Sequence, residues 1–332
     1  CTNICPIDVF QPNTTVCRSS TGRCDPQEIC TGDAAACPAD IASPISRVCA
    51  FKYYDQDGNG VSPNDAPIPE WSFTLASGDA TPIGLTHGQC AELPNGGVWT
   101  VAEGAIADPW VNTSAASITA DIAECNAAVN YSFSNLCVGQ GNGHSVAFWA
   151  GVTGRERIVN TSEAQASSVC NREPVSLYRM PCCNAAAGCA GPTYELQLLN
   201  SLRLRLANGS DADFAVSTAG VTALQAWLSG AEATNQAYAL SAQLAAMVLS
   251  VKQDLVNKAS IIYSPGCGAS GVDQAFISVQ QLVETANAAL ADNAQVPAGN
   301  PQRARLTCLT QALERANNNV NFVQPLGSCS AP

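Results

Sequence analysis

Seventeen of the 332 residues are cysteine, and this feature constrains the fold more than any other. Cytosolic thiols are kept reduced, whereas an exported protein gains cross-links from its cysteines. Zinc modules need paired knuckles of closely spaced cysteines. The closest spacings here, Cys1 with Cys5 and Cys182-Cys183 with Cys189, do not form two such knuckles. We therefore predict disulfides and an extracellular protein, with at least one cysteine left free, lipidated or paired between chains because the count is odd.

Two positions qualify this prediction. The chain begins at Cys1 without a basic and apolar leader, so we expect that a signal peptide has been removed; a lipid anchor on Cys1 is the alternative. The adjacent pair Cys182-Cys183 is expected to belong to two separate disulfides rather than to a vicinal redox switch. No uninterrupted apolar stretch reaches the ~18 residues of a membrane span, so no transmembrane segment is predicted.

The charge balance excludes several classes of partner. The formal net charge is -12, and the only lysines are Lys52, Lys252 and Lys258. A nucleic-acid binder needs a basic stripe that displaces counterions from phosphates, so we predict no nucleic-acid partner. Anionic membrane surfaces are disfavoured for the same reason. Divalent cations suit this acidity best, and a simple gain in solubility is the alternative explanation for it.

The first 49 residues hold seven cysteines and few large apolar side chains. Such a segment cannot bury a core and must be stapled. Residues 17–40 read C-R-x5-C-D-x2-E-x-C-T-G-x4-C-P-x-D, with cysteines at 17, 24, 30 and 37. The pattern, from about residue 16 to residue 40, resembles a disintegrin-like repeat, which implies an extended, loop-rich extracellular module. Integrin-binding members carry Arg-Gly-Asp in the loop after the first of these cysteines. Here residues 18–23 read RSSTGR, so a rigid spacer is expected instead.

From Cys49 the chain changes to short apolar runs separated by turn residues. Residues 50–54, 71–75 and 97–101 alternate with the two-residue period of half-buried strands, and a further strand is predicted at 130–137. Short strands separated by turns predict a β-sandwich. Residues 51–61, followed by 68–71, resemble the calcium-binding B repeats of bacterial surface adhesins. That resemblance covers about residues 48–138 and implies a prealbumin-like sandwich.

A loop rich in Asp, Asn and Gly follows the first of these strands. Calcium takes about six to eight oxygen ligands, and side chains at positions one, three and five of a tight loop converge on one point. Gly60 at position six permits the sharp turn, but position twelve is Ala66 instead of a bidentate glutamate. We therefore expect a structural calcium of modest affinity, and a turn without an ion is the alternative. The predicted ligands are Asp55, Asp57, Asn59, the backbone carbonyl of Val61, and Asp65.

The C-terminal part has helical periodicity. Leucine-rich or alanine-rich patterns predict helices over residues 193–206, 236–256 and 271–292, and Pro301 is placed to open a last helix. Residues 141–149, 237–247 and 312–319 resemble segments of a family of modular bacterial secreted proteins of uncertain role. This resemblance implies an extracellular bacterial protein and brings no activity with it.

Catalytic patterns are sparse. His87 and His144 are the only histidines, and no G-x-S-x-G nucleophile elbow exists. The glycine-rich residues 266–271 lack the G-K-[S/T] ending of a phosphate loop. Paired carboxylates of a glycosidase have no fixed spacing, so a secreted hydrolase stays open as the least favoured alternative. Trp110 follows Pro109 in a predicted loop and is the tryptophan expected to be exposed for sugar binding.

The sequence thus predicts a multidomain α+β protein. Residues 1–48 form a small disulfide-rich disintegrin-like repeat, residues 49–138 a calcium-binding β-sandwich, residues 139–192 a cysteine-containing junction, and residues 193–332 a disulfide-bonded, mainly helical domain. The expected function is non-enzymatic and structural, as a self-assembling surface or filament subunit or an adhesin stalk stabilised by disulfides and calcium. The expected partner is therefore a second copy of the chain. A module that binds a cell-surface or matrix glycan is the alternative.

Overall fold

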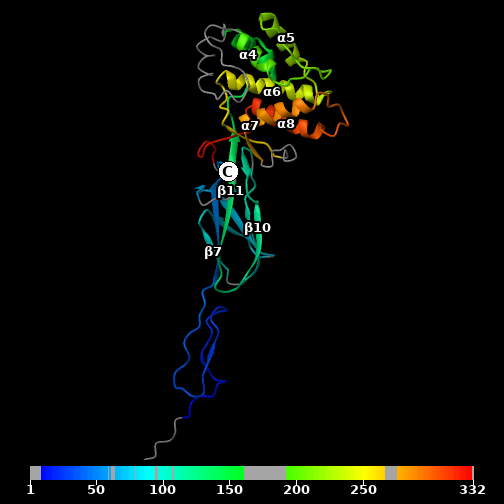
Figure 1. Ribbon diagram of the computed structural model, residues 1–332. Helices are drawn as coiled ribbons and strands as arrows, with labels where there is room; N and C mark the ends of the chain where they lie inside the picture. The colour runs from blue at the N-terminus through cyan, green and yellow to red at the C-terminus, as the bar shows by residue number, and fades with distance from the viewer. Residues whose placement is uncertain are drawn as a thin grey trace, which may run out of the picture. The chain divides into compact units, whose positions relative to one another are not determined.

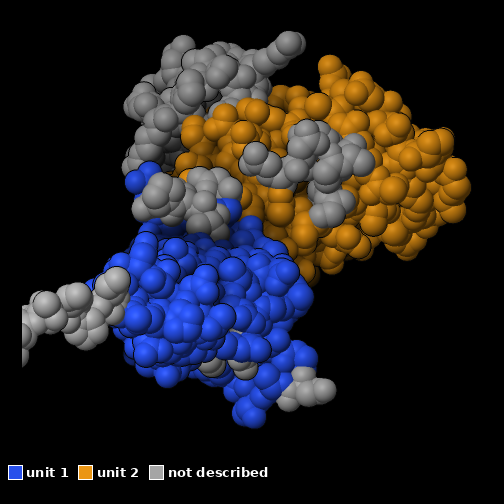
Figure 2. Space-filling view, turned by 90° about the horizontal axis from the view of Figure 1, so that it is seen from below, with its two compact units in different colours: residues 1–55, 59–135, 330–332 blue, residues 56–58, 136–329 orange. Residues whose placement is uncertain are grey.

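The computed structural model describes residues 9–58, 60, 64–78, 80–93, 96–106, 108–160, 192–265 and 275–330. They belong to two compact units, shown in separate colours in Figure 2. The first unit comprises residues 1–55, 59–135 and 330–332, and the second comprises residues 56–58 and 136–329. The described chain combines several sheets with helices, as the predicted α+β class requires.

The first unit begins with a short hairpin. Strand β1 (Val16–Arg18) pairs antiparallel with β2 (Glu28–Ile29), and the Cys17–Cys37 disulfide crosses this region. Val16 and Ile29 are both exposed, as is Ile41. Since so little apolar surface is buried here, cross-links rather than a core hold the segment, as the sequence predicts.

Two sheets make up the rest of the first unit. One is antiparallel, in the order β10 (Ser117–Ile122), β8 (Gly97–Glu103), β5 (Ser72–Ala76) and β6 (Ile83–Thr86). The other sheet is built around β3 (Ser46–Tyr54), which pairs with β7 (Cys90–Leu93) and with β4 (Ala66–Pro67). Strand β3 also pairs with residues 128–135 of β11 (Ala128–Gly139). Strand β9 (Trp110–Asn112) pairs with β11 as well. The rings of Phe73 on β5 and Phe133 on β11 lie 5.2 Å apart, so the two sheets pack face to face.

All four predicted strands are present, in β3, β5, β8 and β11. Their pairing adds a feature that the pattern did not predict, because β3 and β11 are parallel neighbours, with Ala128 opposite Arg47 and Asn135 opposite Tyr54. Cys49 and Cys90 lie opposite each other on β3 and β7 and form a disulfide. The long green ribbon of β11 and the blue strands beside it are visible in Figure 1.

The second unit is mainly helical. Its longest helix, α6 (Gln236–Lys252), is buried along almost its whole length, as expected of a helix whose alanines and leucines permit close packing on every side. Other elements surround the same core, which includes Trp149, Leu244 and Leu313. They are α1 (Val146–Ala150), α2 (Val152–Val159), α4 (Pro192–Asn200), α5 (Thr218–Ser229), α7 (Val279–Asp292), α8 (Arg303–Asn317), β12 (Ile261–Tyr263), β13 (Phe276–Ser278) and β14 (Phe322–Val323).

The bounds of all four predicted helices need correction, and the helix predicted over residues 236–256 ends at Lys252. The helix predicted over residues 193–206 ends at Asn200, whose side chain pairs with the backbone of Phe214 through hydrogen bonds of 2.8 and 2.9 Å. The helix predicted over residues 271–292 begins only at Val279, because residues 276–278 pair with β12 as strand β13 and Ser278 then forms a capping box with Gln281. The helix predicted from Pro301 begins at Arg303.

Two of the sequence phrases that carried the bacterial resemblance meet within the second unit. The Oδ1 of Asn319 accepts hydrogen bonds from the backbone N–H groups of Gly141 (3.3 Å) and Gly143 (2.7 Å), and its Nδ2 donates to the Gly143 carbonyl at 2.8 Å. Asn319 adopts a φ of 62°, a conformation that asparagine tolerates better than most residues. These hydrogen bonds fix the segment before α1 against the end of α8.

A substitution of Gly143 by alanine tests this close approach. The added Cβ would lie 2.2 Å from the Ala316 carbonyl oxygen, which is backbone and cannot swing away. We expect Gly143→Ala to lower the free energy of unfolding by about 1–3 kcal/mol, measured by urea unfolding followed by far-UV circular dichroism. Gly84→Ala is the control, because a Cβ there meets nothing within 4 Å. Equal stabilities of the two variants would contradict the packing described.

Disulfides account for most of the described cysteines. The four bonds between described residues are Cys17–Cys37, Cys24–Cys125, Cys49–Cys90 and Cys137–Cys329, and Cys308 is also disulfide-bonded. Cys30 is free and half-buried. The disulfide interpretation of the cysteines therefore holds for the described part of the chain. The predictions for Cys1, Cys182 and Cys183 lie outside the described residues.

Candidate functional site

The interior of the first unit holds an ion pair. Lys52 on β3 is fully buried, and its Nζ contacts Oε1 of Glu103, a fully buried carboxylate on β8 of the facing sheet. The Nζ also lies 4.6 Å from the centroid of the Trp71 ring, a cation–π contact within a buried environment. Burying two charged groups carries a large desolvation cost, which their mutual attraction offsets only when the two groups lie close together.

The protonation of this pair reflects its burial. Desolvation lowers the pKa of Lys52 from its ordinary value of 10.5 to about 8, although the Glu103 carboxylate counteracts part of that change. Desolvation likewise raises the pKa of Glu103, while Lys52 and Asn135 hold it back. Both changes favour the uncharged forms, an amine and a carboxylic acid.

Asn135 on β11 is the third polar residue of this interior. It is fully buried, and neither its Nδ2 nor its Oδ1 has a hydrogen-bond partner of ordinary geometry within the described residues. Oε2 of Glu103 is also without one. The Asn135 side chain nevertheless lies close enough to Glu103 to lower the pKa of that carboxyl group. We define Lys52, Glu103 and Asn135 as the buried triad.

Sequence reasoning missed the buried triad. It identified residues 50–54 as a strand, but alternation alone offers two faces, one with Phe51 and Tyr53 and the other with Ala50, Lys52 and Tyr54. The structure buries the face that carries lysine. The available signal was the rarity of lysine, since only three occur in the chain and one lies between aromatic residues in a predicted core strand.

The predicted calcium loop is partly described. Asp55 is fully buried at the end of β3, and its Oδ2 accepts a hydrogen bond of 2.9 Å from the backbone N–H of Gly60. Tyr54 pairs with Ala66, so the two ends of the loop are held together. Asn59 and Val61 lie outside the described residues. Asp57 lies in the turn two residues after Asp55, and Asp65 directly precedes β4.

A second acidic cluster lies in the N-terminal segment. Carboxylate oxygens of Asp25, Glu28 and Asp40 all lie within 4.8 Å of one another, and Asp25 and Glu28 are buried. Nη1 of Arg18 lies 3.3 Å from Glu28 and 3.9 Å from Asp40. Hydrogen bonds from Thr21 hold the pKa of Asp25 below its ordinary value. Oxygen ligands at this spacing suit a hard cation, although the arginine already offsets part of their charge. The sequence analysis did not identify this cluster as a metal site.

The second unit contains a hollow of about 730 Å³ between α1, α5, α6 and α8. Alanines form much of its wall, and the amide and hydroxyl side chains of Gln236, Gln243, Thr307, Thr310 and Gln311 provide polar groups. Glu314 is the only acidic or basic residue among those that line it.

The expected exposed tryptophan is in fact buried. Trp110 lies on β9 with 6 % of its surface exposed, and its ring is 5.0 Å from that of Trp71. Its Nε1 donates a hydrogen bond of 2.8 Å to the carbonyl of Ser330. The expectation of an exposed Trp110 was therefore wrong, because the preceding proline does not end a loop here but leads into a short strand that pairs with β11.

Comparisons with known proteins find short stretches of similarity. The chain is 61% identical over 40 residues to "Disintegrin and metalloproteinase domain-containing protein B" of Aspergillus fumigatus, covering 12% of this chain and 5% of that protein. It is 33% identical over 87 residues to "Disintegrin and metalloproteinase domain-containing protein adm-2" of Caenorhabditis elegans, covering 24% of this chain and 9% of that protein. These matches support the disintegrin-like repeat.

The similarity ends there. The chain spans less than a tenth of the length of either relative, so their activities do not transfer to it. No family profile matches the chain, and no solved structure is similar to it. Among the described residues, no helix combines the length and the apolar character that crossing a membrane requires.

Proposed function

We propose that the chain is a non-enzymatic structural module of an extracellular protein, acting as a spacer, adhesin stalk or subunit of a surface assembly. The observation that carries the proposal is the pair of long-range disulfides, Cys24–Cys125 and Cys137–Cys329, which join residues 101 and 192 positions apart. Such bonds constrain the unfolded chain strongly and persist only in an oxidising compartment. They suit a protein that must keep its form outside the cell.

Assembly with further copies of the same chain is part of this proposal. Among the described residues, the edge strands β6 and β10 of the antiparallel sheet are each paired on one side only, so they offer backbone groups to another strand. Electron microscopy and light scattering of the purified chain, with and without a calcium chelator, test it. Ordered polymers would support the structural role, whereas monomers at every concentration and calcium level would contradict self-assembly and leave the spacer alone.

Calcium binding at the loop after β3 is a further part of the proposal, and the resemblance to adhesin B repeats motivates it. The hydrogen bond from Gly60 to Asp55 closes the loop between the predicted positions six and one, which favours convergence of the side chains between them. The Asp55 side chain is buried, and a cation bound to its carboxylate would offset the cost of that burial.

We expect calcium to stabilise the first unit. For a dissociation constant of about 0.1–1 mM, about 10 mM calcium would add roughly 1.4–2.7 kcal/mol to the free energy of unfolding. Asp55→Asn should abolish the increase, while Asp121→Asn, an exposed residue on β10, should retain it. Thermal unfolding with and without calcium measures the effect. If Asp40→Asn abolishes the increase and Asp55→Asn does not, the ion binds at the N-terminal acidic cluster instead.

A second candidate function, binding of a carbohydrate or matrix ligand, is favoured by the hollow in the second unit. Its amide and hydroxyl groups can form hydrogen bonds with a neutral polar ligand. A glycan array tests this function, with Gln243→Ala as the variant expected to lose binding. Absence of any bound glycan would leave the structural role as the remaining proposal.

A further inference from the structure

The hollow in the second unit has two fixed carboxamides on its floor. Gln236 and Gln243 lie seven residues apart on α6, so they are two helical turns and about 10.5 Å apart on one face of the helix. Nε2 of Gln236 donates a hydrogen bond of 2.9 Å to Oγ1 of Thr310 on α8. Oε1 of Gln243 accepts one of 2.8 Å from Nδ2 of Asn317, also on α8. Each carboxamide is therefore held by one of its two polar atoms.

The other polar atom of each carboxamide has no hydrogen-bond partner among the described residues. These atoms are the acceptor Oε1 of Gln236 and the donor Nε2 of Gln243. Gln236 is only 4 % exposed, and both residues line the hollow. A buried polar atom costs free energy unless a ligand or solvent supplies the missing partner. The floor of the hollow thus offers one acceptor and one donor in fixed positions.

The same two hydrogen bonds show how α6 and α8 run. Both bonds join residues 74 positions apart, so the two helices are parallel and in register over this stretch, side by side in Figure 1. Glu314 lies four residues after Thr310 and three before Asn317, on the same face of α8. Along the hollow it is therefore at a level between Gln236 and Gln243. Glu314 is exposed, which places its carboxylate at the rim.

The remaining lining is mostly small and apolar. Ala239 and Ala242 lie between the two glutamines on α6, and Val146, Ala147 and Ala150 of α1 also line the hollow. Because these side chains are short, the main chain of a ligand can approach the helices closely. None of the described residues that line the hollow is aromatic, so they offer no ring on which a sugar could stack. The volume of about 730 Å³ is that of a ligand-binding cleft.

We propose that this hollow binds an extended peptide of a partner protein, with a lysine or arginine side chain of the peptide at Glu314. The inference rests on the second candidate function, binding of a matrix ligand in the hollow, and names the class of partner. It does not depend on self-assembly or on calcium.

The spacing of the two glutamines suits a peptide main chain. A peptide in the polyproline II conformation has about three residues per turn and rises about 3.1 Å per residue, so backbone groups about 9.3 Å apart point the same way. That repeat is within reach of two carboxamides separated by two helical turns. One backbone N–H of the peptide donates to Oε1 of Gln236, and one carbonyl accepts from Nε2 of Gln243. Such main-chain hydrogen bonds give affinity that depends little on the peptide sequence.

The carboxylate at the rim decides which side chain is accepted. Glu314 is the only acidic or basic residue among those that line the hollow, so a basic side chain is attracted at that level and an acidic one is repelled. The formal net charge of -12 acts in the same direction at longer range. Since an exposed ion pair is weak, Glu314 contributes more to discrimination between peptides than to affinity.

Peptide arrays test the proposal on the full chain. One array holds short fluorescent peptides with arginine at the centre and every amino acid in turn at the flanking positions. A second array has glutamate at the centre and is otherwise the same. We expect the arginine array to bind and the glutamate array not to bind. Fluorescence anisotropy then gives the dissociation constant of the best arginine peptide for each variant.

Three variants separate the roles of the lining residues. Gln243→Ala should raise the dissociation constant about three- to tenfold, because it removes one hydrogen-bond donor. Ala239→Leu should abolish binding, because the larger side chain fills the floor of the hollow. Glu314→Lys should move the preference from the arginine array to the glutamate array, an outcome that loss of folding cannot imitate.

The matched controls lie on α7, from which no described residue lines the hollow. Gln280→Ala, Ala288→Leu and Glu284→Lys make the same three changes there. Each should leave both the dissociation constant and the preference for arginine unchanged. Circular dichroism establishes that every variant is folded.

The proposal is overturned if the folded, unaltered chain binds no peptide of the arginine array at about 1 mM, or if Glu314→Lys keeps the preference for arginine. A glycan that binds the unaltered chain and not Gln243→Ala, in the absence of any bound peptide, would overturn the peptide as partner and leave ligand binding in the hollow in place. Failure to polymerise would contradict self-assembly alone, since peptide binding is measured on the isolated chain.

Discussion

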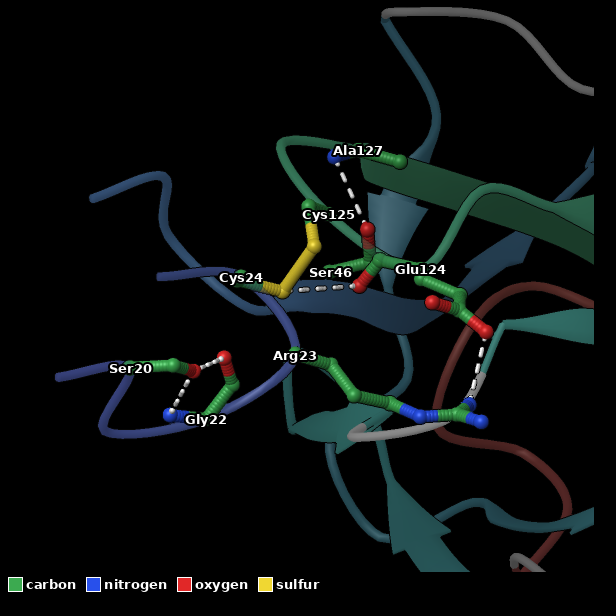
Figure 3. Close-up of a disulfide and its surroundings, with 8 residues drawn as sticks. All are labelled: Ser20, Gly22, Arg23, Cys24, Ser46, Glu124, Cys125 and Ala127. Atoms are coloured by element: carbon green, nitrogen blue, oxygen red, sulfur yellow. Dashed lines mark hydrogen bonds and ion pairs between the residues drawn. A yellow bond between two sulfur atoms is a disulfide. The ribbon is translucent and has the colours of Figure 1, made fainter. Parts of the chain in front are cut away.

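Replacing Cys24 and Cys125 together with serine is expected to lower the free energy of unfolding of the first unit by about 4–5 kcal/mol, because the bond closes a loop of about a hundred residues. Figure 3 shows this bond with some of the residues around it. Arg23 and Glu124 form an ion pair of 2.6 Å, but both side chains are about half exposed, so the pair contributes about 0–1 kcal/mol. Hydrogen bonds from Ser46 to Glu124 and from Ala127 to Ser46 remain.

The measurement is denaturant unfolding combined with limited proteolysis. We expect cleavage between residues 38 and 46 in the double serine variant, since only the backbone then joins the N-terminal segment to the rest of the unit. The Cys17→Ser/Cys37→Ser variant is the matched control, because its bond spans only 20 residues and lies wholly within the N-terminal segment. An unchanged free energy of unfolding in the Cys24 and Cys125 variant would show that this bond contributes nothing to stability.

Lys52→Met is expected to cost about 3–5 kcal/mol, because it leaves the Glu103 carboxyl group buried without its partner. The double variant Lys52→Met/Glu103→Leu should recover much of this loss, since apolar side chains of similar volume often replace a buried pair without penalty. Urea unfolding of the single and double variants measures the difference.

Both variants lack the lysine amine, so the comparison isolates the effect of leaving the Glu103 carboxyl group without its partner. If the single variant is as stable as the double variant, the Glu103 carboxyl group has access to water or to another partner, and the buried pair does not have the energetic role inferred from its burial.

Residue patterns predicted the local elements well where a single physical property decides them. Alternation located β3, β5, β8 and β11, and the cysteine count led to disulfides. The sequence could not show which strands pair with each other, because the parallel contact of β3 with β11 joins segments about 80 residues apart and leaves no local signal. The same limit explains why Lys52, Glu103 and Asn135 were not grouped.

Two other predictions failed because tertiary contacts overrode the local sequence signal. Residues 201–206 have the leucine spacing of a helix, but Arg205 pairs with Asp211 and Leu204 accepts from the backbone of Ala212, which ends α4 early. Trp110 was expected at the surface because proline precedes it, whereas edge-to-face contacts with Trp71 and Tyr54 place it inside. The ligand positions Asn59 and Val61 fall outside the described residues, so the calcium site stays a prediction.

The order of the disulfides along the chain has a consequence for the path of a pulling force. A pull applied on the N-terminal side of Cys24 passes through its sulfur to Cys125, and residues 25–124 lie outside that path. At Cys137 the force crosses to Cys329, and residues 138–328 are bypassed in the same way. Between Cys24 and Cys329, therefore, only the backbone from Cys125 to Cys137 carries tension. Under such a load the chain would extend by a small fraction of its contour length, while most of its folded residues remain slack.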